Sequence, residues 1–357
     1  MEEIIKRHNH YVPEMYLNNW AHEKRIYSYQ LLVSHNNVPL WNHSAVKNTA
    51  SIDNLYVRVS KGNEIDDFEN EFMKYETAAK EPLLKACTDQ RMTPNDWHEL
   101  IGFVATQIVR TPAFFFRTKD KMKEFLPTIL DDIGKKLAIL TPEEIKQHSH
   151  KKTSADDLIP AAVRLTDIKP DNDHRYVEIK TIAGKSLWLF SIDHLIKKTA
   201  SILHEHKWSI ISASNGIKWP TSDDPVLCLN YYGKNDYDFW GGWGNPGSEI
   251  IMPISPRKAL YTQVGKKHSP CLNYTYEESL LLKKLITEHA FMYVYASDQD
   301  VEIPLFRPRI VDIEEYRRIM KELSEWHGKY KEEEVPLLEK RLITDNPNPN
   351  YDSRRKL

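Results

Sequence analysis

A change in the spacing of the apolar residues near position 66 constrains the fold of this chain more than any other feature. Segments 25–29 and 55–59 alternate apolar and polar residues, which is the two-residue period of short, half-buried strands. From 66 to about 86 the apolar side chains recur instead at steps of three and four, so they share one face of a helix. The chain therefore begins with strands and continues with helices.

A second helix is predicted to begin at Thr93, because threonine caps helix N-termini and Pro94 fits the first turn, where a missing N–H costs nothing. Residues 100–109 are mostly apolar, which predicts a helix that is buried on most sides. Pro112 disfavours helical geometry in the residue before it. The helix should therefore end or kink just after Arg110.

The second half of the chain is rich in strand patterns, at 175–182, at 208–212 and in several short segments between 226 and 296. Helices in the first half and strands in the second are typical of an α+β protein. We expect a helical N-terminal half packed on a largely antiparallel C-terminal sheet, which N-terminal strands can join.

The length of 357 residues can bury a substantial core, and we expect a single domain over residues 1–340. A polar insertion is expected near 141–173, with a short apolar helix at 158–165 inside it. Residues 345–357 combine Pro, Asn and basic side chains, which predicts a flexible tail.

Charge and cysteine content narrow the functional classes. A net charge of −2, from 49 basic and 51 acidic residues, gives no overall field to bind a polyanion, so nucleic-acid contact would need a local patch. Cys87, Cys228 and Cys271 lie far apart and match neither a disulfide framework nor a metal knuckle. With no apolar signal segment and no apolar run long enough for a membrane span, we expect a cytoplasmic protein with no membrane partner.

Polar residues on the two long helices are the first candidates for chemistry. Glu69 and Glu76 are seven positions apart and share a helix face, with about 10 Å between them. Gln107 and Arg110 share a face of the next helix, in so apolar a sequence that the guanidinium should be at least half buried and needs an anion. Arg110 could bridge the helices to a glutamate as a structural ion pair, or bind a substrate phosphate or carboxylate beside a catalytic glutamate.

The opening segment holds two histidines, His8 and His10, before a Tyr11-Val12-Pro13 turn. Because the side chains of an extended segment alternate, the two rings should project to opposite faces. This disfavours coordination of one metal ion by both histidines. His10 is the candidate for proton transfer, and a histidine hydrogen-bonded to the backbone is the alternative.

A second polar loop, Thr221-Ser222-Asp223-Asp224-Pro225, lies between two predicted strands. Asp223 could bind a metal, accept a proton or contact a sugar hydroxyl, but Ser and Asp also form turns by bonding their own backbone. The aromatic, glycine-rich run 231–244 fits either a packed hairpin or a stacking platform for bases.

Five short blocks follow one another between about residues 7 and 297: His8-x-His10-Tyr11-Val12-Pro13-x-x-Tyr16-Leu17, the Glu69 and Glu76 pair, Gln107-x-x-Arg110-Thr111-Pro112, Thr221-Ser222-Asp223-x-Pro225 and Met252-Pro253-Ile254-Ser255-Pro256. In this order they resemble the blocks of an uncharacterised bacterial family, domain of unknown function number 4238. That pattern has Asn where this chain has Asp224, and Phe where it has Trp20. The resemblance implies one domain spanning the chain and no established activity, cofactor or partner.

The candidate site combines four catalytic and three substrate-binding residues: His10, Glu69, Glu76 and Asp223, and Gln107, Arg110 and Ser222. We expect them to converge on one pocket of a hydrolase for a phosphate-containing substrate, a nucleotide or a nucleic acid, acting in bacterial defence or toxicity. No cofactor is identified, and a divalent metal is a candidate. Two alternatives stay open: a transferase that uses a nicotinamide dinucleotide, and a non-enzymatic binding or sensor module. The sequence does not indicate an oligomeric state.

Overall fold

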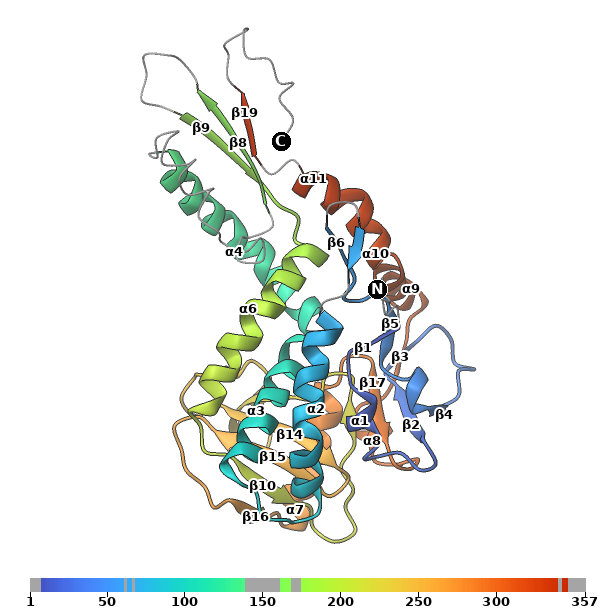
Figure 1. The fold of residues 1–357 in the computed structure, drawn as a ribbon. Helices are drawn as coiled ribbons and strands as arrows, with labels where there is room; N and C mark the ends of the chain where they lie inside the picture. Colours follow the sequence, from blue (N-terminus) through green and yellow to red (C-terminus); the bar gives the residue numbers. More distant parts are fainter. Residues whose placement is uncertain are drawn as a thin grey trace, which may run out of the picture. The chain divides into compact units, whose positions relative to one another are not determined.

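The computed structural model of the protein describes residues 8–60, 63–65, 68–138, 161–167, 175–339 and 342–345. Its contacts group the chain into two compact units, which we call unit 1 (Met1–Phe115 and Ile192–Ser324) and unit 2 (Phe116–Ser191 and Glu325–Leu357). Helices and sheets that are antiparallel or mixed make up an α+β fold, as expected (Figure 1). The single domain expected over 1–340 stays a prediction, and most of the predicted insertion and tail lies outside the described residues.

The largest described sheet of unit 1 has six strands in the order β13-β12-β14-β15-β10-β16. Neighbouring strands are antiparallel except β10 and β16, which are parallel. All six come from the second half of the chain, and the sequence predicts β10, β12, β14 and β15 among them. Their bounds are Ser209–Ser212 (β10), Leu227–Gly233 (β12), Asp236–Asp238 (β13), Glu249–Ser255 (β14), Lys258–Gln263 (β15) and Cys271–Asn273 (β16).

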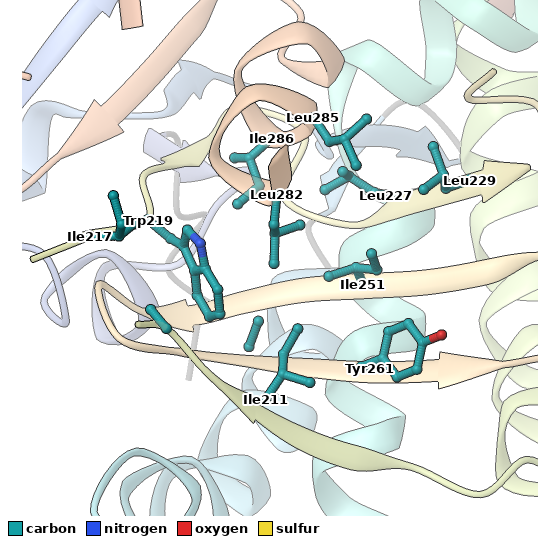
Figure 2. Close-up of a cluster of buried hydrophobic side chains, with 12 residues drawn as sticks. Ile211, Ile217, Trp219, Leu227, Leu229, Ile251, Tyr261, Leu282, Leu285 and Ile286 are labelled. Atoms are coloured by element: carbon teal, nitrogen blue, oxygen red, sulfur yellow. The ribbon is translucent and has the colours of Figure 1, made fainter. Parts of the chain in front are cut away.

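Helices cover this sheet on both faces. Five consecutive residues of β14, from Ile250 to Ile254, are buried, and successive side chains of a strand point to opposite faces. Helix α7 (Tyr276–His289) packs Leu282, Leu285 and Ile286 onto one face, against Ile251 and its neighbours (Figure 2). On the other face β14 contacts α2 (Phe68–Cys87), which itself packs on α3 (Pro94–Val109).

N-terminal strands join C-terminal ones in a second sheet of unit 1, which has the order β11-β17-β2-β4 and is antiparallel throughout. Strand β2 lies between β17 and β4, so the two ends of unit 1 share hydrogen bonds, as expected. The bounds are Arg25–Gln30 (β2), Trp41–Ala45 (β4), Thr221–Ser222 (β11) and Tyr293–Ala296 (β17). Three short pairs accompany them: β1 (His8–His10) with β5 (Ser51–Asp53), β3 (Leu32–Val33) with β18 (Ile310–Val311), and β6 (Arg58–Ser60) with β7 (Asn63–Ile65).

The helix boundaries follow the local signals in the sequence. Thr93 caps α3 through a capping box, in which its Oγ1 accepts from the Asp96 N–H (3.2 Å) and the Asp96 carboxylate accepts from the Thr93 N–H (2.7 Å). Helix α3 ends at Val109, and α4 (Pro112–Ala138) begins at the proline, which confirms the predicted break. The short helices of unit 1 are α1 (Glu14–Leu17), η1 (Val46–Asn48), α8 (Ile303–Phe306) and α9 (Ile313–Ser324).

Unit 2 contains a three-stranded sheet in the order β19-β8-β9, with most of α4 and the start of α6 (Lys185–His204). Strand β8 occupies Ala162–Asp167, so the short helix predicted at 158–165 is wrong: this segment pairs with β9 (Arg175–Lys180) and β19 (Leu342–Asp345). Sheet pairing with a distant segment overrides the local apolar pattern. The last helices are α10 (Trp326–Lys329), η3 (Tyr330–Glu334) and α11 (Val335–Glu339).

Candidate functional site

The predicted residues of the two long helices form a buried ion pair. Arg110 follows α3 and is completely buried. Its Nη1 donates to Oε1 of Glu76 (2.7 Å), and its Nη2 donates to the carbonyl oxygen of His10. The guanidinium lies over the ring of Phe72, 4.2 Å from the centroid. Burial opposes the charge, but Tyr56 and Glu76 raise the pKa of Arg110 above its ordinary value, so it stays ionised.

Gln107 lies one turn before Arg110 and is equally buried. Its Nε2 donates a long hydrogen bond to Oγ1 of Thr106 (3.3 Å). Its Oε1 and the Nε of Arg110 have no hydrogen-bond partner among the described residues. In this buried cluster these two atoms therefore keep the capacity to bind a further polar group.

Glu69, the other predicted glutamate, has a different partner from Glu76. Its Oε1 accepts from Nδ2 of Asn9 (2.9 Å), and Oδ1 of Asn9 accepts from the backbone N–H of Tyr56 (3.4 Å). Glu76 is thus the glutamate that neutralises Arg110, whereas Glu69 fixes the opening strand β1 to α2. The sequence left open which glutamate pairs with the arginine.

The two histidines of β1 do not diverge as strand alternation predicts. Their rings lie edge to face with centroids 5.3 Å apart. Nε2 of His10 is 3.1 Å from the carbonyl oxygen of Lys47, and Nε2 of His8 is 3.3 Å from the same oxygen. The expected opposite orientation is wrong, because both side chains bend toward η1. His8 is exposed and His10 is buried, and Nε2 of His10 also lies 3.7 Å from Glu14.

In the loop 221–225, which we call the late loop, Ser222 forms hydrogen bonds within its own turn. Its Oγ donates to the carbonyl oxygen of Asp224 (2.8 Å) and accepts from the Asp224 N–H (3.1 Å). The Asp223 carboxylate accepts from three backbone N–H groups, those of Phe291 (2.9 Å), Met292 (2.7 Å) and Tyr293 (3.1 Å). The loop is thereby tied to the start of β17.

Electrostatics around Asp223 link this loop to the opening segment. Burial raises the pKa of Asp223 to about 7; hydrogen bonds from Met292 and Phe291 oppose the rise, and the nearby Asp224 adds to it. Burial also raises the pKa of Tyr11 well above its ordinary value, and the charge of Asp223 adds to that increase. The opening segment and the late loop therefore meet, through Tyr11 next to the predicted His10.

Asp224 contacts a histidine that the sequence analysis did not single out. Nε2 of His289, at the end of α7, lies 3.4 Å from Oδ2 of Asp224, and both side chains are buried. Nδ1 of the same ring is 3.1 Å from the Asp224 carbonyl oxygen, and the ring of Phe239 packs on it at 5.0 Å. Nothing near His289 marked it in the sequence, because its carboxylate partner is 65 positions away.

Hydrogen bonds from α1 and the residues after it connect the opening segment to the late loop 221–225 and to strand β14. The Tyr16 hydroxyl lies 2.7 Å from Oγ1 of Thr221 and donates to the carbonyl oxygen of Pro253 (2.5 Å). Nδ2 of Asn19 donates to the Ile254 carbonyl (2.8 Å), and Nε1 of Trp20 donates to the Trp219 carbonyl (2.8 Å). The opening block is therefore fixed to strand β14 and to the late loop.

A cavity of about 400 Å³ lies between α7 and the strands β12, β14, β15 and β16. Leu229, Ile251, Leu282 and Leu285 give it an apolar wall, and Figure 2 shows these side chains beneath and on α7. None of the seven predicted site residues lines it. The cavity was missed in the sequence because its wall is assembled from five elements, each with an ordinary apolar pattern.

Polar side chains gather in this cavity: Glu249, Tyr261, His268, Asn273, Tyr274 and Glu278. Burial raises the pKa of Glu249, and hydrogen bonding to Tyr261 and the charge of Lys266 only partly offset it. Burial and the negative charge of Glu249 raise the pKa of Tyr261. The cavity thus holds a carboxylate whose charge is incompletely compensated.

Among the described residues, no group of three or more His, Cys, Asp or Glu side chains is placed to hold a metal ion. No helix of the described segments is long and apolar enough to cross a membrane. Cys87, Cys228 and Cys271 are free thiols. The divalent metal considered from the sequence stays a prediction.

Comparison with known proteins gives a family and nothing more specific. The family model described as "Protein of unknown function (DUF4238)" matches residues 8–300. No curated protein and no solved structure matches the chain. The matched range contains all seven predicted site residues and the whole lining of the cavity.

Proposed function

The chain belongs to the DUF4238 family, and we propose that it is a small-molecule-binding protein whose ligand occupies the cavity between α7 and the six-stranded sheet. One observation carries the proposal: the cavity of about 400 Å³ has an apolar wall and a few converging polar groups. Small-molecule sites typically enclose roughly 300–1,000 Å³ and have this composition. The proposal develops the binding or sensor module that the sequence left open.

The contacts of the sequence-predicted residues support a structural role for them. Arg110 already binds a glutamate and a backbone carbonyl, and its guanidinium is covered by an aromatic ring. The Asp223 carboxylate already accepts three backbone N–H groups. Apart from Nε of Arg110, which has no partner among the described residues, these groups are bonded within the protein and stabilise the fold, and this supports ligand recognition at the cavity instead.

A ligand screen by thermal shift tests the proposal. Ligands that bind the folded protein should raise Tm by an amount that grows with the logarithm of the ligand concentration, and at one hundred times Kd the added stability is about 2.7 kcal/mol. Leu281→Trp places an indole at the cavity wall and should abolish the shifts. Leu84→Trp on α2, whose leucine is 53% exposed, is the matched control and should keep them. Equal shifts in both variants would place the ligands elsewhere and reject the proposal.

A second candidate function is the hydrolase for a nucleotide or nucleic acid. The observation that favours it is the cluster of buried titratable groups around Asp223, whose pKa is raised to about 7, and the neighbouring Asp224–His289 pair. A carboxyl group whose pKa lies near neutral, as at Asp223, is suited to proton transfer. A divalent metal, a cytoplasmic location and a role in bacterial defence belong to this candidate, and the transferase that uses a nicotinamide dinucleotide stays a prediction from the sequence.

The hydrolase candidate is tested with a panel of nucleotides and nucleic acids, with and without Mg²⁺ or Mn²⁺. Glu69→Gln keeps the shape of the side chain and an oxygen that can accept from Asn9. It should therefore leave Tm nearly unchanged and abolish turnover if Glu69 is catalytic. Turnover that persists in Glu69→Gln, His10→Gln and Asp223→Asn would remove these residues from the catalytic role.

A further inference from the structure

We propose that the cavity beneath α7 recognises an organic cation, a protonated or quaternary amine with an apolar body. This inference rests on the proposed binding function and adds the chemical class of the ligand. It follows from the charges, the aromatic rings and the apolar surface that line the cavity.

The charged groups of the lining are mainly acidic. Glu249 and Glu278 are both lining residues, whereas the lining includes no lysine or arginine. Glu249 lies at the start of β14 within the wall, and Glu278 is an exposed residue of the first turn of α7. A phosphate or carboxylate ligand would have to lose its hydration next to these two carboxylates. The lost hydration and the like-charge repulsion both cost free energy.

Glu249 has only partial compensation for its charge. Tyr261 stabilises its carboxylate by hydrogen bonding, and Lys266 acts on it as a charge without lining the cavity. The neighbouring lining residue Tyr274 is a phenol and supplies no positive charge. A ligand cation would complete an ion pair with Glu249, in a site where partial burial strengthens the attraction.

Aromatic rings line the same space. Tyr231, Tyr261 and Tyr274 come from β12, from β15 and from the segment before α7. The ring of His268 packs against Tyr261 with centroids 5.3 Å apart. Tyrosine faces attract ammonium groups, and several such rings with one carboxylate form the usual recognition site for alkylated ammonium ions. Leu281, Leu282 and Leu285 of α7 supply the apolar surface for the remainder of the ligand.

Three probes of similar shape and different charge test this assignment: phenyltrimethylammonium, the neutral tert-butylbenzene and the anionic phenyl phosphate. Binding is measured by calorimetric titration on the full chain. The cation should bind at least about tenfold more tightly than the neutral probe, and phenyl phosphate should bind more weakly than both.

The variant Glu249→Gln keeps the size of the side chain and removes its charge. It should lower the affinity for phenyltrimethylammonium about tenfold and leave the affinity for tert-butylbenzene unchanged. The neutral probe thereby reports whether the cavity is still folded. Glu277→Gln, a neighbouring exposed position of α7 that does not line the cavity, should change neither affinity.

The outcomes separate the two proposals. Saturable binding of the neutral probe or of phenyl phosphate in preference to the cation, or an unchanged cation affinity in Glu249→Gln, overturns the organic-cation assignment and leaves the binding cavity standing. Binding of all three probes that survives Leu281→Trp, or no binding of any probe, overturns the cavity as a ligand site and the assignment with it.

Discussion

Replacing Asp223 with asparagine removes a buried carboxyl group from the loop 221–225, which is hydrogen-bonded to the start of β17. In the native protein Oδ1 accepts from the Phe291 N–H, and Oδ2 accepts from the N–H groups of Met292 and Tyr293. Asparagine keeps one acceptor oxygen and turns the other into a donor. At least one backbone N–H then loses its acceptor, which costs about 1–3 kcal/mol.

A second, pH-dependent effect has the opposite sign. Burial raises the pKa of Asp223 from 3.8 to about 7, so between these values the folded state holds a proton that the unfolded state has lost. The stabilisation from this group is complete below pH 3.8 and is lost as the pH rises through about 7. At about 1.36 kcal/mol per pH unit the loss approaches roughly 4 kcal/mol, and asparagine, which does not titrate, avoids it.

Urea denaturation of the native protein and Asp223→Asn measures this difference at intervals from about pH 4.5 to pH 8. The native protein should be the more stable at the acid end, and its advantage should shrink or reverse toward pH 8. Asp236→Asn, at an exposed position of β13, is the control and should differ from the native protein by a constant amount. If the stability of the native protein relative to Asp223→Asn instead grows with pH, the three N–H donors stabilise the ionised carboxylate more than burial destabilises it. That result would refute the reasoning.

Three further predictions concern residues of unit 1. Glu76→Gln should lower the free energy of unfolding in urea by about 3–5 kcal/mol, because it leaves the fully buried Arg110 guanidinium without its counter-charge; Arg110→Met should cost less, because water can reach the Glu76 carboxylate, whose side chain is 26% exposed, and the reverse order would contradict this account. Tyr16→Phe removes a hydroxyl that bonds both a threonine and a backbone carbonyl, and should cost about 1–3 kcal/mol in the same assay. Partial burial raises the pKa of Cys87 to about 11, so at pH 8 mass spectrometry should find iodoacetamide on the exposed Cys271 well before Cys87; equal rates would contradict the burial of Cys87.

Sequence signals that depend on a few neighbouring residues, such as helix caps and helix-breaking prolines, predicted the structure correctly. The capping residue Thr93 and the break before Pro112 are set by hydrogen bonds and steric contacts within one helical turn, so the sequence alone locates both ends of α3. The buried state of Arg110 also followed from its apolar neighbours. Which glutamate it pairs with did not follow, because Glu69 and Glu76 lie on the same face of α2 and only the packing of β1 separates them.

Features that depend on distant segments were not predictable. The strand β8 was expected to be a helix, since nothing local reveals its pairing with β19, which lies near the end of the chain. The rings of His8 and His10 converge on one carbonyl of η1, which strand alternation cannot indicate. The cavity beneath α7 is built from residues between 229 and 285, each of which is an ordinary strand or helix residue by itself.

The bonds of Tyr16, Asn19 and Trp20 set the order in which the protein can mature. Their acceptors, the carbonyl groups of Pro253, Ile254 and Trp219, follow them by 237, 235 and 199 residues. On the ribosome these three side chains emerge long before the groups they bond have been translated. At about 5–20 residues per second this interval lasts about ten seconds or more, during which the large Trp20 ring lacks its final cover. Nascent chains are therefore exposed to chaperones and proteases at this end until late in synthesis.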